Sequence, residues 1–312
     1  MTPYKRAKRY LVYIIARIFL FFLTLVPFRF SLLLGEIIGL AAHLVAVKPR
    51  QIATKQLQER MLYDKLQASK AVRRLFRNCG LLAVEMAFLP KIYKRLKEYV
   101  TIDDSDLADI RNELSKNRGV VIVSAHLGNW ELLAQRMVVE QMPSTVLARL
   151  NPNQYLGEWI VEQRERAGLE VIDRQDSNAA RRVLAALKKN RIVGFLIDQD
   201  TRVKSAFVPF FGSKASTPVG AAQFALRNST PTFFMYTCRQ EKGHRIFVQP
   251  VSLAPFLEMT REEGIIAMTR YLTELIEKAV REHPDQWMWF HERWKTQPLP
   301  QTAVKGKAQE AV

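Results

Sequence analysis

A histidine and a carboxylate stand five positions apart in the segment His126-Leu-Gly-Asn-Trp-Glu131. An apolar, β-branched run at residues 120–123 leads into this segment through Ser124 and Ala125. A carboxylate that holds one imidazole nitrogen as N–H leaves the other nitrogen free to accept a proton, which is the base-and-orienter half of a catalytic triad. The spacing therefore makes His126 a candidate general base and Glu131 the candidate carboxylate that orients it.

The geometry of the pair constrains the local structure. Five residues of one continuous helix turn the chain by about 500°, which leaves the two side chains about 140° apart. They can meet only if His126 precedes a helix and Glu131 lies in its first turn. Gly128 permits a tight approach, and Asn129 is a favoured N-cap residue. We therefore expect a strand–helix junction, with Glu131 at the second helical position, where the helix dipole favours its ionised form.

Local spacing also leaves a second interpretation open, in which His126 is a structural histidine at a strand end and Glu131 is a surface residue. One histidine and one acid make a short pattern that is weakly specific by itself. Under the catalytic interpretation, no serine or cysteine nucleophile is required if the substrate supplies its own hydroxyl group.

The elements that must position this pair follow an α/β pattern from residue 100 onward. Buried-strand patterns alternate with helical ones, which predicts a mostly parallel central sheet flanked by helices. The last strand is a candidate for antiparallel pairing with its neighbour. Expected strands are 120–124, 145–148, 170–172, 192–197, 232–238 and 245–251, and expected helices are 51–65, 68–88, 105–116, 130–140, 153–167, 178–190, 217–227 and 261–283.

Two apolar runs, residues 11–26 and 30–47, precede this region. The first would span about 24 Å as a helix, less than the roughly 30 Å hydrocarbon core of a bilayer. No small-residue cleavage site follows it, so we do not expect a removed signal peptide. Basic residues flank the runs at both ends, which disfavours a single crossing and favours a shallow hairpin or helices lying in the membrane interface. Burial of both helices in the core of a soluble protein is the alternative.

The composition narrows the class of partner. The 312 residues carry 47 Lys and Arg against 30 Asp and Glu, a formal net charge of +17. Such a surplus favours nucleic acid, anionic lipid, phosphorylated substrates or an acidic carrier protein. The surplus is spread along the chain and no zinc-finger or RNA-recognition signature occurs, which disfavours nucleic acid. The two cysteines provide no disulfide framework and no paired metal motif.

Several motifs together resemble the bacterial lipid A late acyltransferases (lauroyl and myristoyl acyltransferases), within the lysophospholipid acyltransferase superfamily. The His126–Glu131 block looks like the H-x4-[DE] motif of that superfamily. The other matching features are the hydrophobic N-terminus, Arg149 in Ala-Arg-Leu-Asn-Pro-Asn, Asp198-Gln199-Asp200, Pro209-Phe210-Phe211-Gly212 and the segment Trp-Phe-His-Glu-Arg-Trp-Lys at 289–295.

This resemblance implies an enzyme that transfers an acyl chain from an acyl carrier protein thioester to a hydroxyl of a lipid A precursor. His126 would deprotonate the hydroxyl, and Glu131 would orient His126. The oxyanion would be stabilised by the amides of Gly128 and Asn129 and by Arg149. Asp198 would hold Arg149 or position the acceptor. The motifs fix the reaction better than the acceptor, so a glycerophospholipid or glycosylated lipid remains the alternative.

The resemblance further implies a phosphorylated glycolipid acceptor, an anionic membrane surface, no cofactor and no metal, and a location on the cytoplasmic face of the inner membrane. We expect a membrane anchor at 1–47, a catalytic domain at 48–297 and a flexible tail at 298–312.

The sequence leaves two interpretations open for each of two aromatic clusters. Phe207, Phe210 and Phe211 line an acyl channel or belong to the core, and the tryptophans at 287–294 sit at the lipid headgroups or pack inside.

Overall fold

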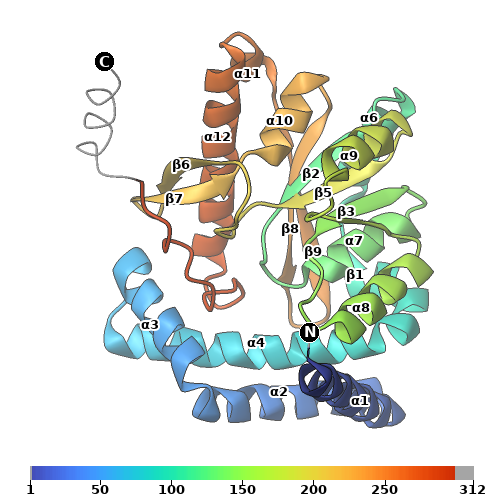
Figure 1. The fold of residues 1–312 in the computed structure, drawn as a ribbon, viewed down its shortest axis with the longest axis vertical. Coiled ribbons are helices and arrows are strands. Elements are labelled where there is room, and N and C mark those ends of the chain that lie inside the picture. The colour runs from blue at the N-terminus through green and yellow to red at the C-terminus, as the bar shows by residue number, and fades with distance from the viewer. Residues whose placement is uncertain (1, 299–312) are drawn as a thin grey trace.

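The apolar run ahead of His126 forms the central strand of the sheet. This strand, β2 (Val120–Ser124), is buried along its whole length. It pairs in parallel with β5 (Ile192–Leu196) on one side and with β8 (Thr232–Arg239) on the other. The structure is a computed structural model that describes residues 2–298 (Figure 1).

Within residues 2–298, the main sheet has seven strands, in the order β1 (Val100–Thr101), β9 (His244–Val251), β8, β2, β5, β3 (Ser144–Ala148) and β4 (Glu170–Asp173). Its strands pair in parallel except β8 and β9, which are antiparallel. The predicted mostly parallel sheet is therefore confirmed, as is the antiparallel strand at 245–251. Parallel strands place their carboxyl ends at one edge, which is where ligand sites form in such sheets.

Successive residues of β2 serve two different cores. Val121 and Val123 pack with buried residues of α9 (Ala179–Lys188), α10 (Gly220–Arg227) and α12 (Arg261–Glu282). Val120 and Ile122 pack on the other face with residues of α6 (Asp104–Ser115) and α7 (Trp130–Val139). Both faces of the sheet are covered by helices, so β2 reads as a continuous apolar run rather than as an alternating one.

The N-terminal helices lie outside this sandwich. Figure 1 shows α4 (Lys65–Ile92) running across one end of the sheet, with α2 (Phe28–Val45) along its far side. The helices α2 and α4 meet backbone to backbone, because a Cβ on Gly80 would lie 2.0 Å from the carbonyl oxygen of Gly35. A Cβ on Gly39 would likewise lie 2.3 Å from the carbonyl oxygen of Phe76. These glycines fix α2 along α4.

The outward faces of α1 (Pro3–Leu25) and α2 are apolar and exposed. In α1 the buried position is Leu23, and in α2 the buried positions are Ser31, Gly35 and Gly39. The interpretation of both runs as buried core helices is therefore wrong. Of the described residues, α2 alone is long and apolar enough to cross a membrane by length and composition.

One predicted helix is wrong at its start. Residues 213–218 form β7, which pairs in antiparallel register with β6 (Ser205–Phe210), and the helix α10 begins only at Gly220. Phe211 and Gly212, both at positive φ, make the turn between the two strands. Pro218, which lies in the first turn of the helix predicted at 217–227, instead ends a strand.

The remaining predicted helices and strands are present with small shifts at their ends. The tail predicted at 298–312 lies, apart from Pro298, outside the described residues. The other elements are α3 (Val47–Met61), η1 (Tyr93–Arg95), α5 (Leu96–Tyr99), β1 (Val100–Thr101), β3 (Ser144–Ala148), α8 (Gln154–Arg166), β4 (Glu170–Asp173) and α11 (Ala254–Leu257).

Candidate active site

His126 lies just past the carboxyl end of β2 and contacts a carboxylate from the neighbouring strand. Its Nδ1 atom is 2.8 Å from Oδ1 of Asp198, and its backbone N–H donates to Oδ2 of Asp198 over 2.8 Å. The sheet register explains the meeting. Ser124 of β2 pairs with Leu196 of β5, and His126 and Asp198 each stand two residues further on.

Asp198 is buried, with 2% of its surface exposed, and is fixed by a third bond from the indole Nε1 of Trp287 at 2.8 Å. Burial by itself raises the pKa of Asp198, but the charge and hydrogen bonds of His126 and the bond from Trp287 outweigh it and hold the pKa below its ordinary value. The ionised carboxylate holds Nδ1 of His126 as N–H. Nε2 is then the nitrogen that can accept a proton.

Glu131 has a different partner from the one predicted. It lies at the second position of α7, as expected, but its carboxylate accepts two bonds from the guanidinium of Arg164 on α8, one of them 3.0 Å from Nε. The predicted contact between Glu131 and His126 is therefore wrong, and Asp198 holds the histidine. Asp198 contacts His126 and Trp287, and among the described residues no bond joins it to Arg149, whereas its expected role in positioning the acceptor stays a prediction.

The junction between β2 and α7 forms as predicted. Asn129 is the N-cap of α7, and its side chain accepts from the backbone N–H of Leu132 over 3.3 Å. Gly128 has φ +59°, and a Cβ there would lie 2.0 Å from the carbonyl oxygen of Thr237. Only glycine fits at this point, so the turn that aims His126 depends on Gly128.

The amides of this junction are committed to structural bonds. Gly128 N–H donates to the carbonyl oxygen of Gln286 over 3.0 Å, and Asn129 N–H donates to Oγ1 of Thr237 over 3.0 Å. Asn129 is fully buried as well. The predicted role of these two amides as oxyanion donors is therefore wrong, because their hydrogens point into the protein.

A cavity of about 1090 Å³ opens beside His126 at the carboxyl edge of the sheet. Its described lining carries more positive than negative groups. The exposed Arg149, which follows β3, is among them, whereas Gly128 and Asn129 do not line the cavity. The charged and imidazole residues that line it are His126, Glu131, Arg149, Arg164, Arg174, Asp200, Arg202, His291 and Lys295.

Comparison with known proteins identifies the family of the chain. The family described as bacterial lipid A biosynthesis acyltransferase matches residues 1–296. The chain belongs to this family. It is 28% identical to the lipid A biosynthesis palmitoleoyltransferase of Escherichia coli (strain K12) over 293 residues, which cover 89% of each chain. The sequence-based resemblance is thus confirmed, and the protein is an acyltransferase.

More distant relatives extend the comparison. The lipid A biosynthesis lauroyltransferase of Escherichia coli (strain K12) is 28% identical over 195 residues, which cover 61% of this chain and 60% of the relative. The phosphatidylinositol mannoside acyltransferase of Mycolicibacterium smegmatis (strain ATCC 700084 / mc(2)155) is 26% identical over 197 residues, which cover 62% of each chain.

The aromatic residues of this acyltransferase form the wall behind the site rather than a channel or a headgroup belt. Phe210 and Phe211 are buried and contact the ring of Trp294, and Trp287 and Trp289 are fully enclosed. The core interpretation is therefore confirmed for these residues. Their packing fixes Trp287, which in turn fixes Asp198. Phe207, by contrast, is 39% exposed.

A buried charge network ties the junction of the acyltransferase to α4. The Asn129 side-chain amide donates to Oε2 of Glu85 over 2.9 Å, and Glu85 also accepts from Arg239, His244 and Tyr99. Burial raises the pKa of Glu85, but the bonds and charges of His244 and Arg239 outweigh it and hold the pKa far below its ordinary value. The carboxylate is therefore a permanent acceptor for the cap residue.

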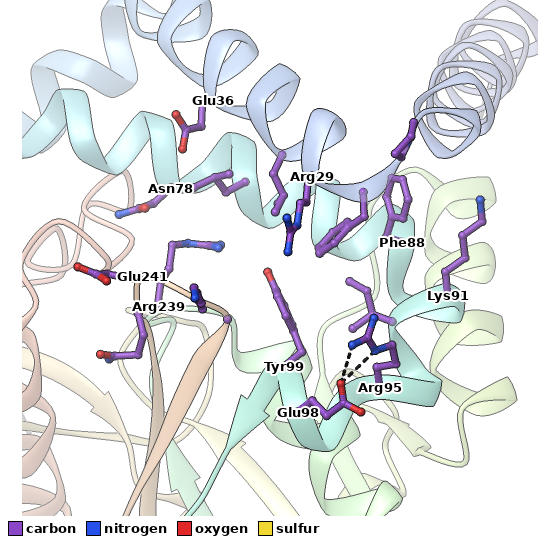
Figure 2. A pocket seen from close by; sticks show the side chains of 18 of the residues that line it. Arg29, Glu36, Asn78, Phe88, Lys91, Arg95, Glu98, Tyr99, Arg239 and Glu241 are labelled. Atoms are coloured by element: carbon purple, nitrogen blue, oxygen red, sulfur yellow. Dashed lines mark hydrogen bonds and ion pairs between the residues drawn. The ribbon is translucent and has the colours of Figure 1, made fainter.

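The network borders a second cavity, of about 1240 Å³, between the N-terminal helices and the sheet. Figure 2 shows Tyr99 and Arg239 projecting into it from the sheet side, opposite Arg29 of α2. The apolar part of this cavity's wall includes Phe28, Leu32 and Phe88. The carboxyl edge of the sheet, which carries His126, is thus joined through α4 to the helices with exposed apolar faces.

Proposed function

We propose that this enzyme transfers a fatty acyl chain from an acyl carrier protein thioester to a hydroxyl of a lipid A precursor. The observation that carries the proposal is the His126–Asp198 pair, whose histidine lines an electropositive cavity in a chain that belongs to the lipid A acyltransferase family. A histidine base oriented by an ionised carboxylate suits a reaction in which the nucleophile is a substrate hydroxyl.

The reaction follows from that geometry. Nε2 of His126 takes the proton of the acceptor hydroxyl, and the resulting oxygen nucleophile attacks the thioester carbonyl carbon. The C–S bond of the tetrahedral intermediate then breaks, and the leaving thiolate recovers the proton from His126. Asp198 stabilises the imidazolium that exists between the two proton transfers and keeps Nδ1 protonated throughout.

The acyl carrier as donor is supported by charge. The chain carries a formal charge of +17, and acidic proteins associate faster with surfaces of opposite charge. The described lining of the His126 cavity adds five cationic side chains against two carboxylates. This positive charge would attract a carrier that presents its thioester on a phosphorylated arm. It would attract an anionic lipid acceptor as well.

Membrane association is supported by the apolar outer faces of α1 and α2. Phe22, Phe30 and Ile37 are each more than half exposed. Because Gly35 and Gly39 fix α2 against α4, we propose that α2 lies in the interface on the cytoplasmic face of the inner membrane rather than crossing it. This placement brings the carboxyl edge of the sheet close to lipid-borne acceptors.

A second acceptor class has a specific observation in its favour. The relative from Mycolicibacterium smegmatis is named for phosphatidylinositol mannoside, a glycosylated lipid. The same base and the same thioester chemistry would serve such an acceptor. The two candidates differ in substrate and share one mechanism.

The experiment that tests the proposal supplies the purified full-length enzyme with a panel of donors and acceptors. The donors are acyl carrier protein thioesters and the matching coenzyme A thioesters. The acceptors are a lipid A precursor, phosphatidylinositol mannoside and a lysophospholipid, and products are identified by mass spectrometry. We expect an acyl ester on the lipid A precursor, made from the carrier-bound donor. An ester formed only on another acceptor would refute the assignment to lipid A.

A further inference from the structure

Two arginines leave neighbouring strands at the same level of the sheet. Ala148 ends β3 and pairs with Asp173, which ends β4, and Arg149 and Arg174 come next in each strand. The backbone N–H of Arg174 donates to the carbonyl oxygen of Ala148 over 2.8 Å. Both arginines line the cavity that contains His126. The register therefore brings two guanidinium groups to one place at the ligand-binding edge.

Neither guanidinium forms an ion pair within residues 2–298. No hydrogen bond or ion pair joins the side chain of Arg149 or Arg174 to another described residue. Two half-buried arginines of this protein are instead paired with carboxylates, Arg164 with Glu131 and Arg239 with Glu85. Burial of Arg174 and the charge of Arg149 lower the pKa of the Arg174 side chain, and they outweigh the opposing charge of Asp173. Two neighbouring cations that are bonded to no carboxylate form a site that an anion would complete.

The sheet order places this pair at a defined distance from the base. β5 lies between β2 and β3, and β4 follows β3 at the edge. Because neighbouring strands are about 4.8 Å apart, the ends of β3 and β4 are roughly 10 and 14 Å from the end of β2. An anion held there can belong to the molecule whose hydroxyl reaches His126.

We propose that Arg149 and Arg174 bind a phosphate monoester of the lipid acceptor, an assignment that rests on the proposed acyl transfer at His126. A phosphate monoester carries nearly two negative charges at neutral pH and three acceptor oxygens, which match two forked guanidinium groups. The phosphodiester in the arm of an acyl carrier is the other source of phosphate, and its single charge matches the pair less well. Arg149 thereby acts on the substrate's phosphate rather than as the oxyanion donor expected from the sequence.

The test compares Arg174→Gln, Arg149→Gln and the double variant of the full-length enzyme. The control is Arg181→Gln, because Arg181 is exposed on α9 and does not line the cavity. Each protein receives a lipid A precursor with its phosphates and the same lipid after phosphatase treatment. We expect each single variant to raise the KM for the phosphorylated acceptor by about 10- to 100-fold with little change in kcat. For the wild type, removing the phosphates from the acceptor should raise KM by the same factor as a single variant does. For the double variant, removing the phosphates should raise KM little further.

Other outcomes would overturn the proposal. A raised KM for the thioester, with that for the acceptor unchanged, assigns the pair to the arm of the carrier. A fall in kcat that is the same for both acceptors assigns Arg149 to the oxyanion.

A binding measurement separates this proposal from the proposed function. The affinities of the same two lipids, dispersed in detergent, are measured by thermophoresis without any donor. We expect the wild type and Arg181→Gln to bind the phosphorylated lipid at least tenfold more tightly than the treated one, and Arg174→Gln to lose that preference. Equal affinities in the wild type refute the phosphate site even if acyl transfer is confirmed. A preference that depends on Arg174 supports the site even if no transfer is detected.

Discussion

Replacing Asp198 by asparagine isolates the orienting role of the carboxylate, because the structure dictates how the asparagine must sit. Oδ2 of Asp198 accepts from two groups that can only donate, the backbone N–H of His126 and the indole N–H of Trp287. The carbonyl oxygen of the asparagine must take that position. Its NH2 group then faces Nδ1 of His126 and donates to it, so the imidazole proton moves to Nε2. The base loses the lone pair with which it accepts the proton of the hydroxyl.

The expected loss in kcat follows from the change of tautomer. A base held in the wrong tautomer, with its geometry intact, loses about 10³- to 10⁴-fold in kcat, as in the corresponding variant of a serine protease triad. This corresponds to roughly 4–5.5 kcal/mol of transition-state stabilisation. The assay is the initial rate of labelled acyl transfer from acyl carrier protein to the lipid A precursor, with kcat and KM determined separately. KM should change little, because Asp198 is buried behind His126.

Acid stability supplies an independent measurement on the same variant. The pKa of Asp198 is depressed in the folded protein. Its contribution to stability is therefore present above the unfolded-state pKa of about 3.9 and is lost as the pH falls through the lower folded-state pKa. Asp198→Asn should lack this part of the acid-induced loss in urea unfolding curves. A variant within tenfold of wild-type kcat would refute the tautomer argument, most clearly if Glu131→Gln lost a thousandfold instead.

Three further outcomes are expected. Glu131→Gln should cost about 1–3 kcal/mol of unfolding free energy, because it breaks the enclosed pair with Arg164, and should lower kcat far less than Asp198→Asn; a double-mutant cycle with Arg164→Gln that proved additive would contradict this coupling. Gly128→Ala should destabilise the protein by about 2–4 kcal/mol in thermal unfolding. The control Gly212→Ala is also at positive φ but has open space around its Cβ, and it should cost about 1 kcal/mol. Equal costs for the two variants would contradict the steric argument. Ile37→Glu on the exposed face of α2 should weaken binding to anionic vesicles by roughly 10- to 100-fold in flotation assays, and the matched change Leu257→Glu on α11 should not; unchanged flotation of Ile37→Glu would place the membrane contact elsewhere.

The sequence predicts the parts of this protein that depend on near neighbours. The continuous run of apolar, β-branched residues gives the buried strand β2, and the types of Gly128 and Asn129 give the turn and the cap. The position of His126 follows directly from these. Each of these features is set by backbone conformation within a few residues, so the chain itself carries the signal.

The carboxylate that holds His126 could not be chosen in the same way. Asp198 lies 72 residues further along the chain and reaches His126 only because β2 and β5 are neighbours in the sheet. No local sequence pattern predicts the order of strands in a sheet. The prediction therefore used Glu131, which is the acid nearest to His126 along the chain. One signal was available, since both His126 and Asp198 follow a predicted buried strand and would meet if those strands were adjacent. Trp287 reaches Asp198 from outside the named strands, through an isolated β-bridge to Leu127, and its role had no such signal.

The helix predicted at 217–227 shows a second kind of limit. Thr217 and Pro218 are favourable at a helix start, yet pairing with β6 extends β7 through both residues. Tertiary pairing overrides a local preference whenever a partner strand lies alongside.

The claim that His126 is the base of an acyl transfer is tested most directly by His126→Ala in a single-turnover experiment. Enzyme in excess over labelled acyl carrier protein thioester is mixed with the lipid A precursor, and ester formation is followed by mass spectrometry. Circular dichroism and the unfolding midpoint verify that the variant is folded. The account predicts a rate at least 10³-fold below that of the wild type, with acceptor binding retained. A folded variant that forms the ester within tenfold of the wild-type rate would contradict it.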